Sequence, residues 1–161
     1  MKEYLFRGLR PDNGEWVFGG ICDYGGGIEI LEVSHYAGSM YEPPSTDVYE
    51  TEVLEESVGQ FTGVEDKNGV KVFEGDIIKH HIRFTGNTEK EVLGVVKFGS
   101  YESKSGSKEV GFYIEWKDSL YSACCRNDIR YWLEDGGEEP AVVVGNIFDN
   151  ADLIKEAEEQ K

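Results

Sequence analysis

Two adjacent histidines and three cysteines are the side chains in this sequence best suited to metal binding. His80 and His81 are neighbours in a predicted strand, so their rings point to opposite faces and cannot both reach one ion. Cys124 or Cys125 would add a second ligand, but no C-x-x-C or H-x-x-x-H spacing accompanies them. The simpler interpretation is a surface or core histidine whose ring nitrogens are hydrogen-bonded. We therefore predict no metal site.

Nucleophile and phosphate-binding patterns are also missing from the sequence. No serine stands in a G-x-S-x-G frame, and no cysteine stands in a recognisable nucleophile context. Gly25-Gly26-Gly27 is followed neither by a Lys-Ser/Thr pair nor by a G-x-G-x-x-G frame. Asp76 follows Gly75 in a predicted turn, where an aspartate more often accepts backbone N–H bonds than acts in catalysis. We therefore predict no catalytic residue and no cofactor.

The cysteines and the hydropathy pattern indicate a cytoplasmic protein. The cysteine count is odd and two of the three are neighbours, which rarely close a disulfide, so we expect reduced thiols. No apolar run approaches the roughly 18 residues of a membrane span. The first residues lack the basic-then-apolar pattern of a signal peptide.

The charge of the chain is strongly negative and unevenly distributed. Lys and Arg total 16 against 32 Asp and Glu, so the net charge is -16, which disfavours direct binding to nucleic acid or to an anionic membrane. Residues 1–57 carry 12 acidic and 3 basic side chains, residues 58–133 carry 11 of each, and residues 134–161 carry 9 and 2. This pattern is typical of a solvated surface, or of two acidic ends that face a basic partner.

The candidate partner-binding residues come from one aromatic loop and two acidic blocks. Residues 34–45 contain Gly, Ser and a Pro-Pro pair, which predicts a long irregular loop. For the acidic blocks, one hypothesis is that they occupy the DNA-binding face of a host protein as a decoy. The candidates are Tyr36, Met40, Tyr41, Glu50, Glu52, Glu55, Glu56, Glu134, Asp135, Glu138 and Glu139.

The clearest structural signal that could position these residues is the turn Asp66-Lys67-Asn68-Gly69. Asn and Gly accept positive φ, so an Asn-Gly pair between apolar flanks predicts a β-hairpin. Glu74-Gly75-Asp76 predicts a second tight reversal, after which a strand runs to Phe84. Pro11-Asp12-Asn13-Gly14 predicts a third turn near the start of the chain. The sequence therefore indicates a succession of antiparallel strands.

Short strands and one terminal helix account for the rest of the chain. The spacing of Leu153, Ile154 and Ala157, with Asn150 as N-cap, predicts a helix. Gly19-Gly20 is expected to interrupt the second strand, and residues 99–109 are expected to form a loop. The predicted strands are 4–10, 16–18, 28–33, 91–98, 110–116, 119–124 and 141–147. Residues 48–58 could form a strand or a frayed helical turn, and their β-branched and aromatic content favours the strand. A helical or 3₁₀ turn that leads into a strand is predicted within 127–133.

Together these patterns predict a mainly β fold. An acidic N-terminal β subdomain, residues 1–57, is expected to precede a small, strongly bent, SH3-like barrel formed by residues 58–150. Residues 151–161 are expected to form a short C-terminal helix. The abundance of short strands leaves edges to cover, so the sequence also predicts self-association into a homo-oligomer.

Three blocks of the sequence resemble the YopX family. VGQFTG, DKNG and VFEGDIIK, between Val58 and Lys79, resemble its signature. YLFRGLRPDNGEWVFGG near the start resembles its N-terminal hairpin, and VVVGNIFDNADLI near the end resembles its closing strand and helix. The resemblance implies a mainly β domain of unknown function, encoded largely by phages and prophages of bacteria.

Two function classes remain open from the sequence. The first is a non-enzymatic protein-interaction or structural module in the cytoplasm of a bacterial host, with a phage or host protein as its partner. The second is a small-ligand binder or hydrolase that uses a cleft between the two β subdomains. Because no nucleophile motif, metal frame or cofactor fingerprint is present, the first class is favoured.

Overall fold

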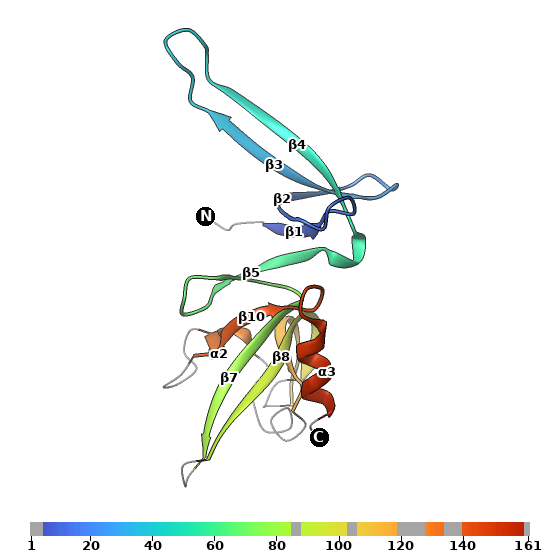
Figure 1. The fold of residues 1–161 in the computed structure, drawn as a ribbon, viewed down its shortest axis with the longest axis vertical. Helices are drawn as coiled ribbons and strands as arrows, with labels where there is room; N and C mark the ends of the chain where they lie inside the picture. The colour runs from blue at the N-terminus through green and yellow to red at the C-terminus, as the bar shows by residue number, and fades with distance from the viewer. Residues whose placement is uncertain (1–4, 85–87, 103–105, 119–127, 134–139, 160–161) are drawn as a thin grey trace. The chain divides into compact units, whose positions relative to one another are not determined.

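The computed structural model describes residues 5–84, 88–102, 106–118, 128–133 and 140–159. The predicted fold class is confirmed, because the chain is mainly β, with two antiparallel sheets consistent with a small β-barrel-like fold and a short C-terminal helix. The chain divides into two compact units, residues 1–61 and residues 62–161. Figure 1 shows the strands and helices of both units.

The first unit contains the strands β1 to β4 of an antiparallel sheet with the order β4-β3-β2-β1-β5-β6. The predicted turn at residues 11–14 joins its first two strands, where Gly14 N donates to Arg10 O (3.0 Å) and Arg10 N donates to Glu15 O (2.9 Å). A short 3₁₀ helix, η1, precedes β5, which continues into the second unit. The elements are β1 Phe6–Leu9, β2 Trp16–Asp23, β3 Ile28–Tyr36, β4 Ser45–Val53, η1 Glu55–Ser57 and β5 Gly59–Glu65.

The core of the first unit is small and the glycines of β2 lie beside it. Val17, Ile30 and Val53 are buried together. The predicted interruption at Gly19-Gly20 is wrong, because β2 runs through both glycines and pairs on either side. A Cβ on Gly19 would lie 2.1 Å from Leu31 O, so a glycine here permits the close approach of β3.

The second unit contains the four-stranded antiparallel sheet β10-β7-β8-β9 and the β5–β6 hairpin. Helix α3 lies beside β8 (Figure 1). The remaining elements are β6 Lys71–Phe73, β7 Asp76–Phe84, β8 Thr88–Glu102, β9 Lys108–Trp116, α2 Ile129–Leu133, β10 Val142–Asn146 and α3 Ala151–Glu159.

The predicted hairpin turn is present at residues 66–69. Gly69 has φ 78°, and Asp66 N donates to Val70 O (2.9 Å). The buried Asp66 carboxylate accepts bonds from Asn68 N (2.8 Å) and Val70 N (3.0 Å) through Oδ1, and from Val143 N (3.1 Å) through Oδ2. One carboxylate therefore organises the turn and joins it to β10.

The second predicted reversal, at residues 74–76, is also present. Gly75 has φ 84° and β7 begins at Asp76. Asp76 is buried and its Oδ2 accepts the N–H of Phe73 (2.8 Å). The expected turn-stabilising role of this aspartate is confirmed.

An aromatic cluster fills the core of the second unit. Trp116 and Trp132 are buried with their ring centroids 5.3 Å apart. The His80 ring lies 4.9 Å from that of Trp132, whereas the neighbouring His81 is exposed. The two histidines therefore point to opposite faces of β7, as predicted.

The limits of two predicted strands, 91–98 and 110–116, are wrong in the second unit. β8 extends to Glu102 and β9 begins at Lys108, so most of the expected 99–109 loop is strand. Tyr101 and Tyr113 stack with centroids 5.3 Å apart, which supports this outer part of the pair. The helix begins at Ala151, directly after Asn150, but Asn150 Oδ1 accepts Asn146 N (3.2 Å) and so stabilises the preceding turn. The expected strand 119–124 lies outside the described residues.

Candidate functional site

The most exposed element of the first unit is the hairpin formed by β3, β4 and the loop between them, residues 28–53, which we call the arm. Its strands pair without a bulge from Ile28↔Val53 to Tyr36↔Ser45. Within the first unit, β2 pairs with β3 only over residues 28–31. The part of the arm beyond Leu31 is therefore a two-stranded ribbon, which Figure 1 shows extending past β2.

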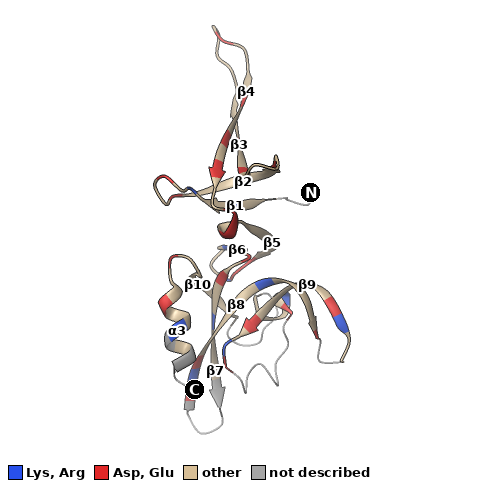
Figure 2. Ribbon diagram, turned by 90° about the vertical axis from the view of Figure 1, so that its right-hand side faces the viewer, with Lys and Arg blue, Asp and Glu red and all other residues tan. Residues whose placement is uncertain are grey.

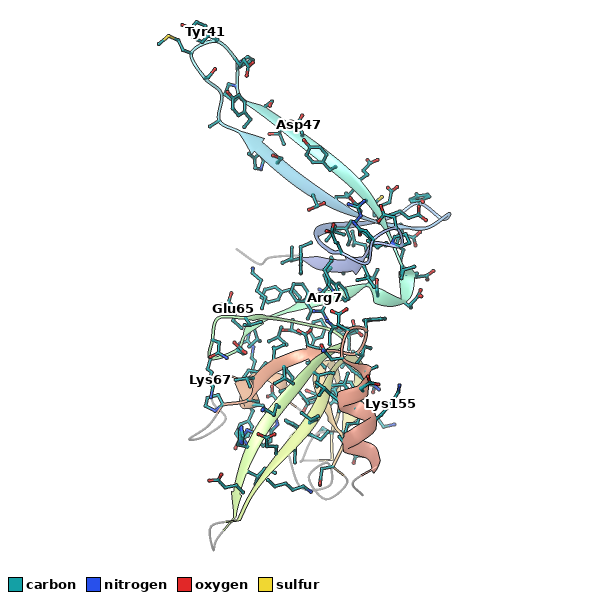
Figure 3. The ribbon with its side chains drawn as sticks, viewed as in Figure 1. Arg7, Tyr41, Asp47, Glu65, Lys67 and Lys155 are labelled. Carbon is teal, nitrogen blue, oxygen red and sulfur yellow. The ribbon has the colours of Figure 1, made fainter. Side chains whose placement is uncertain are left out.

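The outer part of the arm has apolar side chains exposed on both faces. Near its base, Ile30 and Val53 belong to the buried core, but beyond Leu31 no side chain of the arm is buried. Met40 and Tyr41 at the tip are each 91% exposed, and Figure 3 shows Tyr41 there. An isolated two-stranded ribbon is marginally stable in water, and exposed apolar clusters commonly mark interaction sites. The exposed apolar residues are Val33, Tyr36, Met40, Tyr41, Val48 and Tyr49.

Local hydrogen bonds order the tip of the arm. Ser39 N donates to Glu42 O (2.8 Å), and Ser39 Oγ accepts the N–H groups of Tyr41 and Glu42 (3.2 Å each). On the adjoining strands, His35 Nδ1 and Thr46 Oγ1 are hydrogen-bonded across the ladder (3.0 Å). The loop spans residues 37–44 and is shorter than the predicted loop 34–45, because three of those residues continue β3 and one begins β4.

The arm carries only negative formal charge apart from His35. It contains six carboxylates and neither Lys nor Arg. Figure 2 shows Asp and Glu in red along β3 and β4. Glu29 and Glu52 lie directly opposite each other, an arrangement that is mutually repulsive. Partial desolvation, together with the charge of these two carboxylates, raises the pKa of the nearby, half-exposed Tyr24. None of the arm's carboxylates forms an ion pair with a residue that the structure describes. They are Glu29, Glu32, Glu42, Asp47, Glu50 and Glu52.

A family model described as YopX protein matches residues 5–155. The chain belongs to the YopX family. In fold, this YopX chain is similar to the crystal structure of protein EF1440 from Enterococcus faecalis, with 20% sequence identity and a TM-score of 0.52. The similarity covers 96% of this chain and 99% of that chain. No curated protein matches the chain.

The residues that carry the YopX resemblance serve the fold in the second unit. Asp66 and Asp76 are buried and accept backbone N–H bonds, and Gly69 and Gly75 adopt positive φ in turns. These residues hold strand connections together, so the YopX signature marks architecture, and the candidate site lies elsewhere.

The structure places the described partner-binding candidates of this YopX protein in two locations. Tyr36, Met40, Tyr41, Glu50 and Glu52 lie on the arm. The exposed Glu55 and Glu56 lie in η1, beyond the end of β4. Glu134, Asp135, Glu138 and Glu139 lie outside the described residues. The sequence analysis did not select Val33, Val48 and Tyr49, although their spacing in two predicted strands would place Val33 opposite Val48 once the strands were paired.

Within the described ranges, no group of three or more His, Cys, Asp or Glu residues could hold a metal ion. Cys22 is a free, partly buried thiol, whereas Cys124 and Cys125 lie outside the described residues. The helices in the described parts of this YopX chain are too short or too polar to span a bilayer.

Proposed function

We propose that this YopX-family protein is a non-enzymatic interaction module whose arm contacts another protein. The observation that supports the proposal is the outer part of the arm, where both faces expose large apolar side chains and the ribbon gains no burial from its own unit. Such a ribbon gains apolar contacts when a partner covers it. The YopX resemblance supports a phage or prophage origin, with a phage or host protein in the bacterial cytoplasm as the partner.

The charge of the chain supports a protein partner. A net charge of -16 opposes association with nucleic acid and with anionic lipid, because both would bring like charges together. An apolar tip flanked by carboxylates suits a protein surface that combines an apolar patch with basic side chains.

Site-specific photocrosslinking in a bacterial host tests this proposal. A benzophenone amino acid replaces Tyr41 at the tip of the arm, and a matched control replaces Val110, which is 76% exposed on β9 of the second unit. We expect a discrete protein adduct from position 41 and not from position 110. The Tyr41 adduct should also disappear when unlabelled wild-type protein is present in excess, because a specific site saturates.

Two results would contradict the proposed function. One is the absence of any discrete adduct from position 41 in hosts that carry the relevant phage or prophage. The other is an identical set of adducts from positions 41 and 110, which would show that collision rather than binding at the arm produced them.

A further inference from the structure

We propose that the free edge of β4 binds an extended, lysine- or arginine-bearing segment of a partner protein by antiparallel strand addition. This inference rests on the proposed function of the arm and specifies the chemistry of its partner. Strand addition joins main-chain N–H and C=O groups to an open sheet edge, while alternate side chains determine which segment is accepted.

The edge of β4 is long and regular, and no other strand that the structure describes pairs with it. β4 is the outermost strand of its sheet, and its nine residues keep one register with β3 throughout. Natural sheets commonly block such an edge with charged side chains, above all lysine, or with proline, a bulge or a covering loop. The carboxylates of β4 oppose an acidic strand but not a basic one. Inside β4 there is neither proline nor lysine, and Pro43 and Pro44 precede it. Its geometry therefore permits another strand to pair along most of its length.

The side chains of β4 specify the chemistry of the added strand. Residues two apart share a face, so Glu52, Glu50 and Val48 form one row and Thr51, Tyr49 and Asp47 form the other. Directly opposed side chains in an antiparallel pair lie about 4.5–5.5 Å apart, close enough for charge pairing. A complementary strand thus carries basic residues opposite Glu52, Glu50 and Asp47. It carries an apolar residue opposite Val48.

Charge selects a basic partner over a second copy of this chain. Pairing β4 with another β4 would bring together two strands that each carry three carboxylates and neither Lys nor Arg. The two first units would also approach with a net charge of -9 each over residues 1–57. A basic segment instead supplies the cations that the arm lacks, so the same carboxylates oppose self-pairing and favour the proposed occupant.

Binding of defined peptides to the full chain tests the inference. The probe is a labelled peptide with blocked ends, Lys-Thr-Lys-Val-Val-Lys-Thr, which places lysines opposite Glu52, Glu50 and Asp47 in the antiparallel register. A peptide with glutamate at the lysine positions is the charge control. Two further peptides are N-methylated at alternate residues in opposite frames, because only every second amide of an added strand faces its neighbour.

We expect the lysine peptide to bind and the glutamate peptide not to bind. Raising salt from about 50 to about 300 mM should weaken binding roughly tenfold, since exposed charges are screened. One N-methylated frame should retain binding and the other should lose it. Glu50→Gln with Glu52→Gln should weaken binding about tenfold. The matched pair Glu55→Gln with Glu56→Gln removes equal charge from η1 and should weaken it much less.

Several outcomes would overturn the inference. Equal binding of both N-methylated frames, or equal effects of the two glutamine pairs, would show charge attraction without strand addition. Dimerisation of the full chain that excludes the peptide would assign the edge to a second copy. A discrete crosslink from position 41 together with no peptide binding would refute strand addition. The proposed function of the arm would still be supported.

Discussion

The Asp66 carboxylate connects the hairpin turn at residues 66–69 to β10. It is buried and accepts three backbone N–H bonds, one of them from Val143 in β10. We predict that Asp66→Ala lowers the free energy of unfolding by about 3 kcal/mol, because three backbone N–H groups in part-buried hydrogen bonds lose a charged acceptor. Urea unfolding of both proteins measures the difference.

Two further variants separate charge from packing at this position. Asp66→Asn keeps one acceptor oxygen but sets an amide donor against one of the N–H groups, so its loss should be smaller than that of the alanine variant. Lys67→Ala changes the exposed neighbour in the same turn and should stay within about 0.5 kcal/mol of wild type. Equal stability of the alanine variant and wild type would refute the role assigned to Asp66.

Gly69 provides a clean test of backbone conformation in the same turn. Its φ is 78° and an added Cβ would meet nothing within 4 Å, so a substitution there is strained by the backbone alone. We predict that Gly69→Val costs about 1 kcal/mol or more. Gly111 in β9 also has open space but no positive φ, so Gly111→Val should be nearly neutral. Equal thermal shifts for the two variants would contradict the prediction.

The arm is an element whose outer part contributes little to the stability of its own unit. Val33 and Val48 are paired across the ladder, and no residue between them is buried. We predict that replacing residues 34–47 by Asn-Gly, the preferred two-residue hairpin turn, changes the melting temperature by less than about 3 °C. The same deletion should abolish the adduct formed from the tip in the crosslinking experiment, since the contact surface is gone.

A substitution at the base of the arm should, in contrast to shortening its outer part, destabilise the protein. Ile30 is fully buried beside Val53, so Ile30→Ala leaves a cavity and should cost about 2–4 kcal/mol. A large loss of stability in the shortened arm, comparable to that of Ile30→Ala, would show that the outer ribbon does contribute to folding. That result would remove the argument that the ribbon is present for a partner.

The sequence correctly predicted the elements whose conformation is determined by the preferences of a few neighbouring residues. The turn at 66–69 follows from Asn-Gly and was correctly placed. The ends of β3 and β4 were missed, because Ser34 and His35 pair with Asp47 and Thr46, and a strand with both faces in water has no apolar alternation. β2 was missed across Gly19 because its need for glycine arises from contact with β3, which is remote in sequence. The sequence predicted only part of the arm as a site, because its rows of apolar side chains arise only when β3 and β4 pair.

At the scale of the whole molecule, charge and core are distributed differently between the two units. Among the residues that the structure describes, the buried core cluster of the first unit consists of Val17, Ile30 and Val53. Residues 1–57 nevertheless carry a net charge of -9, out of -16 for the chain. The second unit has an extensive buried cluster that runs in sequence from Val64 to Ala141. Stability therefore resides mainly in the second unit, whereas the surface proposed to meet a partner belongs to the first.

This division predicts how the chain behaves when it is cut. A fragment of residues 58–161 keeps the whole of β5 and every member of the larger core cluster, so it should unfold in one cooperative transition. A fragment of residues 1–61 is near the size at which an independent core becomes marginal, and its described core cluster is small, so it should not fold cooperatively. Thermal melts followed by circular dichroism, with near-ultraviolet signals from Trp116 and Trp132 for the longer fragment, measure both. A broad, non-cooperative melt of residues 58–161 would show that the first unit is required for the second to fold.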